Sequence, residues 1–188
     1  MHIVTLAGSP KPHSKSSSLL AYLSQSLQQD ADRVQHFSIQ DLHVPALLAA
    51  DLTHTSIQAL QAAVAQADGV IIASPVYKAS FSGVLKTILD VLPQGALAYK
   101  TVLPVASGGS LAHLLALDYA LKPVLSALKA QEILSGVFAV DSQIQIDAQP
   151  IILDTSLRER LDQAAQQFAH ALRCRRSYAD THNLAYSA

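Results

Sequence analysis

Eleven residues near the N-terminus hold a dense group of side chains that could bind a small anion. The stretch Gly8–Ser18 has five serines and two lysines, and it lies between an apolar run, Ile3–Ala7, and an amphipathic run, Leu19–Leu27. This order predicts a strand, a loop and a helix. Amides at a helix N-terminus point out of the helix, where the dipole favours negative charge. The loop therefore has phosphate-binding groups, and we single out Ser9, Lys11, Ser14, Ser16 and Ser17.

This loop differs from two well-known nucleotide-binding motifs. His13 stands where a Walker A loop has its second glycine, and no Gly-Lys-Ser sequence follows it. Gly8 is the only glycine of the loop, which excludes the dinucleotide-binding fingerprint. Serine is also a common helix N-cap. A capped strand-to-helix turn without a ligand is therefore the alternative interpretation.

Two further loops carry residues suited to a flat ring. The first follows an expected strand at 70–73 and supplies an aromatic side chain and a cation; its residues are Pro75, Val76, Tyr77 and Lys78. The second follows an expected strand at 101–106, and its glycines allow a ligand to approach the backbone closely; its residues are Ser107, Gly108 and Gly109. A surface tyrosine and a simple glycine turn are the alternatives.

Alternating strands and helices position these loops. Strands are expected at 3–7, 34–39, 70–73, 101–106 and 133–140, with helices between them and after the last. This order predicts an α/β fold, a flavodoxin-like doubly wound parallel sheet of five strands in the order 2-1-3-4-5. Ligands bind such sheets at the carboxyl ends of strands one and three. A phosphate site, a ring site and backbone donors at that edge together indicate flavin mononucleotide (FMN).

Length and composition narrow the remaining classes of protein. The 188 residues fit one domain, which we expect over residues 1–174, followed by a mobile tail over 175–188. A net charge of −1 argues against a nucleic-acid partner and against the acidic electron carriers. No run is long enough to suggest a membrane span, and no signal peptide is recognisable. The single cysteine, Cys174, suits a reducing compartment, so we expect a cytoplasmic protein without a metal site.

The stretch Leu111–Ala130 predicts a helix that is apolar on nearly every side. One sheet face cannot cover such a helix, so we expect a subunit interface. Pro123 leaves the carbonyl of Tyr119 without its usual donor, which predicts a kink or π-bulge around Tyr119. His113, near the helix start, is either a neighbour of the flavin or nicotinamide or a helix-start or interface residue.

The chain resembles the NAD(P)H-dependent FMN reductases of flavodoxin-like fold over about residues 1–175. Within them it is similar to the reductase component of two-component alkanesulfonate monooxygenase systems. The segments that carry the resemblance are Ile3–Pro10, Pro75–Lys78 and residues 112–136, including Asp118–Pro123. The family usually has arginine at the position of Lys11, and lysine keeps the charge without the bidentate fork.

The resemblance implies hydride transfer from NADPH, or NADH, to FMN and release of the reduced flavin to a partner monooxygenase. The two cofactors carry this chemistry, so no catalytic acid or base is expected. It also implies a homotetramer with Tyr119 at the interface. The alternative is a dimer in which Pro123 causes only a simple kink. Other functions stay open: an FMN-retaining reductase of quinones, azo dyes or metal oxyanions, a flavodoxin-like electron carrier, and a phosphate-binding module without redox activity.

Overall fold

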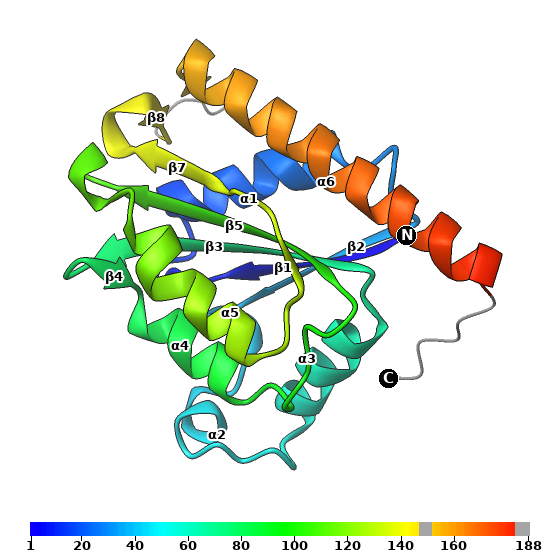
Figure 1. Ribbon diagram of the computed structural model, residues 1–188. Coiled ribbons are helices and arrows are strands. Elements are labelled where there is room, and N and C mark those ends of the chain that lie inside the picture. The colour runs from blue at the N-terminus through cyan, green and yellow to red at the C-terminus, as the bar shows by residue number, and fades with distance from the viewer. Residues whose placement is uncertain (147–151, 183–188) are drawn as a thin grey trace.

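A parallel sheet with helices on both faces forms the centre of the computed structural model, which describes residues 1–146 and 152–182 (Figure 1). Its strands are β1 (His2–Ala7), β2 (Arg33–Ser38), β3 (Gly69–Tyr77), β5 (Thr101–Gly108), β6 (Glu132–Ile133) and β7 (Val137–Val140), and β4 (Ser80–Phe81) forms a hairpin with β3. The order is β2-β1-β3-β5-β6, and β7 also pairs with β5. With β6 and β7 taken as one interrupted strand, this is the predicted flavodoxin-like order.

Two separate apolar layers bury the sheet. Helices α1 (Lys15–Ser26) and α6 (Thr155–His182) cover one face, and α2 (Val44–Leu48), α3 (Thr55–Gln66), α4 (Gly83–Asp90) and α5 (Lys122–Ala127) lie on the other (Figure 1). Leu23 and Phe168 belong to the first layer, and Leu60 and Ile88 to the second. Burial on both faces explains why the strands read as continuous apolar runs. A short antiparallel pair, β8 (Ile144–Gln145) with β9 (Ile152–Leu153), precedes α6.

The last strand, expected over 133–140, is interrupted, and Pro104 explains the break. Pro104 lies within β5 and has no N–H to donate. The N–H of Leu134 donates to the Val102 carbonyl at 2.9 Å, so alternate residues of β5, Pro104 included, face this neighbouring strand. There Gly136 has a φ of +87°, and a Cβ on it would lie 2.6 Å from the Pro104 carbonyl oxygen. The chain therefore leaves the sheet between β6 and β7.

Strand β3 continues past Pro75 to Tyr77, although the sequence predicts its end at Ser74-Pro75. The Ala73 carbonyl accepts the N–H of Gly8 at 2.7 Å, so Ala73 and Pro75, two residues apart, face the side of β1. Because β1 has already ended at Ala7, the missing N–H of Pro75 removes no bond of the sheet.

The C-terminal helix α6 is longer than expected. It runs to His182, so residues 175–182 are helical in place of the aperiodic tail predicted by the sequence. Arg173 pairs with Asp30 at 2.7 Å and Arg175 with Glu132 at 3.1 Å, which ties this part of the helix to the sheet layer. Residues 183–188, and residues 147–150 of the unassigned stretch 141–150, lie outside the described residues. Within the described chain, no helix has the length and apolar character of a membrane span.

Candidate functional site

The three loops with unusual compositions meet at one edge of the sheet. They follow β1, β3 and β5, which are neighbours, with Ala7 beside Ala73 and Pro75 beside Ser107. The backbone of Gly8 joins the first loop to the segments on either side of the second. Its N–H donates to the Ala73 carbonyl, and its carbonyl accepts a hydrogen bond from the buried Ser82 hydroxyl. A Cβ on Gly8 would lie 2.7 Å from the Leu85 Cβ, so this close approach requires glycine.

Ser14 is the N-cap of α1 and the centre of a group of hydroxyls. Its Oγ accepts the N–H of Ser17 at 3.1 Å, and it lies 2.8 Å from the Ser17 Oγ and 3.2 Å from the Ser16 Oγ. The hydroxyl of Ser18 donates to the Ser14 carbonyl at 2.9 Å. The first amides of a helix have no intrahelical acceptor. Serine hydroxyls and open amides therefore stand together at the positive end of the α1 dipole.

The two lysines of this loop differ in their partners. Lys15 Nζ donates to the Asp141 carbonyl at 2.8 Å and lies 3.9 Å from the carboxylate of the same residue. Lys11 is exposed, and the ion pairs found in the described part of the chain do not include it. The buried Ser9 hydroxyl accepts the Lys11 N–H at 3.1 Å, so Ser9 shapes the loop. Lys11 is thus the loop cation that is open to an anion.

The segment Pro75–Phe81 is a tight hairpin, where the sequence predicts an irregular loop. Tyr77 pairs with Ser80 across it, and the turn residues Lys78 and Ala79 have φ values of +50° and +62°. Positive φ at both central residues is the requirement of a type I′ turn, which usually takes Asn or Gly. Such strain, roughly 1–3 kcal/mol per residue, gathers at functional sites. Tyr77 and Lys78 are exposed, so a ring and a cation are accessible beside the loop Gly8–Ser18.

The end of β5 brings backbone to the same edge. Ser107 and Gly108 are buried, and a Cβ on Gly108 would lie 3.2 Å from the Phe138 ring and 3.4 Å from the Val76 Cβ. Gly108 therefore allows this strand end to pack closely. Gly109 is exposed, and a Cβ built there would meet nothing within 4 Å. Its backbone is open to a flat ligand.

The segment after this loop is not one helix. It begins with a 3-10 turn at Leu111–His113 and continues as a π-helix at Leu117–Leu121, which leads into α5. The Lys122 N–H donates to the Leu117 carbonyl, five residues back, one residue before Pro123. The π-helix lies where the sequence predicts a kink or a π-bulge, and Tyr119 at its centre is 79% exposed.

A hollow of about 290 Å³ separates the hairpin turn from the π-helix. Ala79 lines one side, and His113, Ala116 and Tyr119 line the other. The structure thus places His113 and Tyr119 next to the turn that follows Tyr77 and Lys78. The alanine side chains of Ala79 on one side and Ala116 on the other leave room for part of a planar ring system.

Some contributors to this edge have no signal in the loop sequences themselves. Ser74 is fully buried, and its hydroxyl accepts the Ser82 N–H at 2.9 Å. Gln40, which follows β2, donates to the Pro10 carbonyl at 3.2 Å and braces the first loop. Ser82 is the N-cap of α4. Its position before an amphipathic run was the one sequence signal that could have predicted this role. No cluster of His, Cys, Asp and Glu suited to a metal is found among the described residues.

Known proteins share both the sequence and this arrangement. The family model described as NADPH-dependent FMN reductase matches residues 1–145. The chain belongs to this family. An FMN reductase (NADPH) of Pseudomonas putida is 51% identical over 174 residues, which cover 92% of this chain and 88% of the relative. The FMN reductase (NADPH) of Escherichia coli K12 is 51% identical over 172 residues, covering 92% and 90%.

The solved apo structure of an NADH:FMN oxidoreductase, EMOB, has the same fold as this FMN reductase. It superposes with a TM-score of 0.82 at 37% identity, over 90% of this chain and 89% of that one. The family membership confirms the predicted fold class, the oxidoreductase activity and the cofactors, FMN with NADPH or NADH. It also makes the protein an enzyme, so a carrier or a binding module without redox activity is set aside.

Proposed function

We propose that this FMN reductase binds FMN in the site formed by its three loops and releases it, reduced, to a partner monooxygenase that acts on sulfonates. The observation that carries the proposal is the exposure of the site. Lys11, Tyr77, Lys78 and Gly109 are all exposed, and the adjoining hollow of about 290 Å³ falls just below the range of cavities that enclose a ligand. A flavin held at an open edge can exchange with solution, as a substrate must.

The residues present fit each part of FMN. Lys11, the hydroxyls of Ser14 and Ser17, and the first amides of α1 would hold the phosphate, since they combine charge with donors at a helix N-terminus. The Ser16 side chain is 1% exposed, so Ser16 would contribute through its backbone N–H. Pro75, Val76, Tyr77 and Lys78 would bound the ring on the β3 side. Ser107, Gly108 and Gly109 would bring backbone to its other edge. Ser9 is buried and supports the loop from behind.

When bound, FMN would supply the hydride-accepting chemistry toward NAD(P)H, and this chemistry would need no acid or base from the protein. The chain's own contribution is position. The strained Lys78-Ala79 turn fixes Tyr77 next to the hollow, and the capped start of α1 fixes the phosphate donors. We therefore assign no catalytic residue, and we expect substitutions here to alter FMN affinity before they alter turnover.

We further propose that the segment before and within the π-helix joins subunits into a homotetramer. Four large apolar side chains of this segment are exposed: Leu111 at 63%, Leu114 at 42%, Leu115 at 56% and Tyr119 at 79%. Exposed apolar surface of this kind marks an interaction site, and its position beside the hollow would couple assembly to flavin exchange. The free, exposed Cys174 fits a reducing cytoplasm.

NADPH oxidation by desalted protein, with FMN titrated from zero, tests the proposal. Activity that is absent without FMN and saturates as FMN is added supports a released flavin. Full activity without added FMN would overturn release and favour an FMN-retaining reductase of quinones, azo dyes or metal oxyanions. A sulfonate monooxygenase separated by a dialysis membrane should still be driven by the reductase, because the reduced flavin diffuses.

A further inference from the structure

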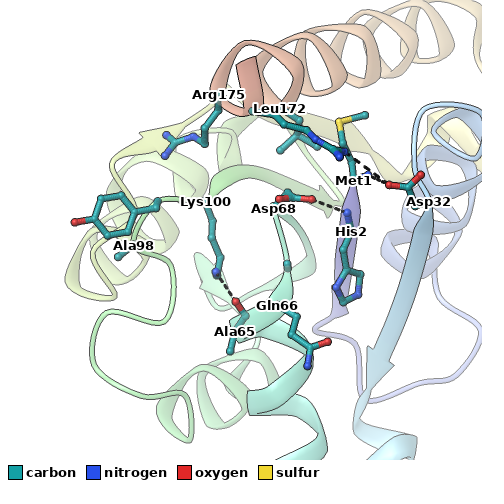
Figure 2. Close-up of a pocket in the computed structure, with 13 residues that line it drawn as sticks. Met1, His2, Asp32, Ala65, Gln66, Asp68, Ala98, Lys100, Leu172 and Arg175 are labelled. Carbon is teal, nitrogen blue, oxygen red and sulfur yellow. Dashed lines mark hydrogen bonds and ion pairs between the residues drawn. The ribbon is translucent and has the colours of Figure 1, made fainter. Parts of the chain in front are cut away.

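A second cavity lies at the opposite end of the sheet from the loops. Its volume is about 690 Å³, within the usual range of small-molecule sites. It opens at the amino ends of β1, β3 and β5, between the end of α3 and the late part of α6 (Figure 2). None of its lining residues belongs to the three loops, so it is separate from the proposed flavin site.

Lys100 is a buried cation in the wall of this cavity. It is 8% exposed, and its ammonium donates to the Ala65 carbonyl at 3.1 Å, at the end of α3 (Figure 2). An ammonium has three donors, and this is the one hydrogen bond it makes within the described chain. Burial lowers the pKa of Lys100; the nearby Asp68 raises it, and the nearby Arg175 lowers it.

Arg175 brings a second cation with spare donors. Its Nη2 donates to Glu132 at 3.1 Å, but its Nε is buried and has no partner in the part of the chain described. Arg175 and Lys100 both line the cavity. Because the Nε has no exposed surface, a ligand in the cavity would meet this guanidinium through its Nη groups, whose planar donors suit an oxyanion. The cavity wall therefore carries two cations, and the ammonium of Lys100 is turned toward Ala65 (Figure 2).

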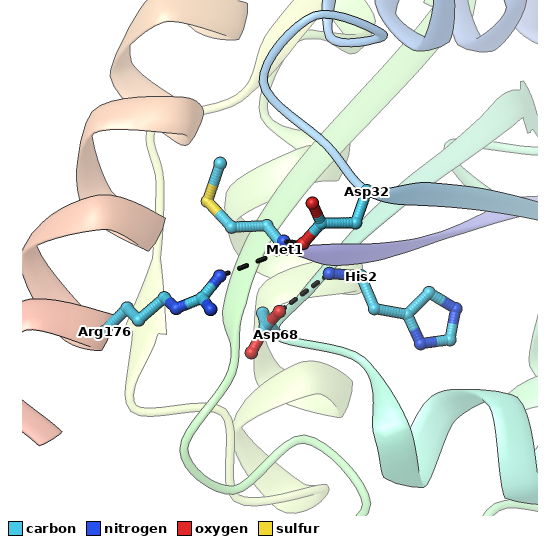
Figure 3. Close-up of polar contacts among 5 residues, drawn as sticks. All are labelled: Met1, His2, Asp32, Asp68 and Arg176. Atoms are coloured by element: carbon cyan, nitrogen blue, oxygen red, sulfur yellow. Dashed lines mark hydrogen bonds and ion pairs between the residues drawn. The ribbon is translucent and has the colours of Figure 1, made fainter. Parts of the chain in front are cut away.

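Two carboxylates, Asp32 and Asp68, also line the cavity. Asp68 accepts the backbone N–H of His2 at 2.7 Å, and Asp32 pairs with the amino group of Met1 and, at 3.9 Å, with Arg176 (Figure 3). These bonds tie the starts of the strands together. The buried Leu172 and Ala67 add apolar surface beside the cations. The cavity thus offers two cations and an apolar wall.

We propose that this cavity binds the phosphate group of a small phosphorylated molecule, with Lys100 and Arg175 as its cationic ligands. The phosphate oxygens accept hydrogen bonds from the spare donors of the Lys100 ammonium and from the Nη groups of Arg175. The apolar wall accommodates the flat or apolar body to which the phosphate is attached. Because the ligand bridges α6 and the start of β5, its binding stabilises the docking of α6 on the sheet.

Calorimetric titration of the protein loaded with one equivalent of FMN tests this site. We expect 5′-AMP to bind one per chain and to raise the Tm by roughly 2 °C or more at saturation, whereas adenosine does not bind. Lys100→Met keeps the apolar stem and removes the buried charge, so it should fold. It should weaken 5′-AMP binding at least about tenfold, the loss of one charged hydrogen bond.

Two control variants locate the effect. Lys86→Met removes an exposed lysine of α4 that pairs with Asp90, and Lys11→Met weakens the proposed flavin loop; both should bind 5′-AMP like the wild type. Inorganic phosphate distinguishes the source of the anion. If phosphate binds as tightly as 5′-AMP, free phosphate is the ligand; if it binds more weakly but competes, a phosphoester is.

Equal binding of adenosine and 5′-AMP would overturn the proposal, as would wild-type affinity in Lys100→Met. Absence of 5′-AMP and phosphate binding to the FMN-loaded enzyme would also overturn it, without bearing on FMN reduction. Should Lys100→Met not fold, Arg175→Gln, at a half-buried position on the helix surface, decides the question by the same tenfold criterion.

Discussion

Replacing Ser14 by alanine separates the two interpretations of the first loop, a phosphate site and a simple helix cap. The hydroxyl of Ser14 accepts the Ser17 N–H at 3.1 Å and lies 2.8 Å and 3.2 Å from the hydroxyls of Ser17 and Ser16. Ser14→Ala removes all three contacts and leaves every other residue of the loop in place. Both interpretations predict a less stable helix start, but only the first predicts a loss of FMN affinity.

The expected magnitudes follow from these contacts. Loss of the N-cap costs about 1 kcal/mol, which lowers the Tm of a domain of this size by roughly 2–4 °C. Loss of one hydrogen bond to a charged phosphate costs about 1.5–3 kcal/mol, which raises the FMN dissociation constant roughly 10- to 100-fold. The turnover number at saturating FMN should stay near the wild-type value, because the ring contacts are untouched.

The assay is a titration of desalted protein with FMN, followed by flavin fluorescence and, separately, by NADPH oxidation. Ser26→Ala is the matched control: it lies at the other end of α1, is exposed, and donates only to the Tyr22 carbonyl, at 3.1 Å. It should change stability by less than about 0.5 kcal/mol and leave FMN affinity unaltered. If Ser14→Ala loses stability but binds FMN as the wild type does, Ser14 is a cap alone and the phosphate assignment is refuted.

Three further changes test other parts of the structure. Gly136→Ala should destabilise the protein by about 2–4 kcal/mol in urea, since φ is +87° and the new Cβ would lie 2.6 Å from the Pro104 oxygen; an unchanged midpoint would contradict the strand break. Burial, together with a hydrogen bond to Asp162, raises the pKa of Tyr22 to about 12. The Tyr22–Asp162 hydrogen bond therefore stabilises the fold below pH 10, and this stabilisation is lost as the pH rises through 12. Tyr22→Phe should lower the free energy of unfolding by roughly 0.5–1 kcal/mol in urea titrations below pH 10, and this deficit should disappear between pH 10 and 12. A deficit that stays constant with pH would count against this assignment. Tyr119→Ala should shift size-exclusion elution toward smaller species or change flavin retention, and identical behaviour would argue against an interface at the π-helix.

Several features were predictable because their signals are local. The apolar run Val70–Ala73 and the alternation of strands with helices predict a doubly wound sheet, and that topology alone brings the loops after β1, β3 and β5 to one edge. The π-helix was predictable from Pro123, because a proline removes a donor at a known distance along the helix. The charge and hydroxyl content of Gly8–Ser18 pointed to an anion site.

Other features depended on partners far away in the chain. Gly136 in the sequence gives no sign of a strand break, which arises only because Pro104 is its neighbour in space. Positive φ values at Lys78 and Ala79 were hidden because neither residue type favours that conformation. The helical C-terminal end was missed for a similar reason. Salt bridges from Arg173 to Asp30 and from Arg175 to Glu132 tie it to distant segments.

The sequence by itself determined the order of elements and the loop edge, because periodicity and proline act on neighbouring residues. Its clustered serines and lysines also predict the anion binding that we propose at this edge. Only the tertiary structure decided what Lys100 does. In the sequence it is a polar residue before an apolar strand, typical of a solvated surface. In the fold it is buried, and its ammonium donates to the Ala65 carbonyl at the end of α3. Burial and charge depend on distances in space, and the packing of α3 and α6 against the sheet sets these distances.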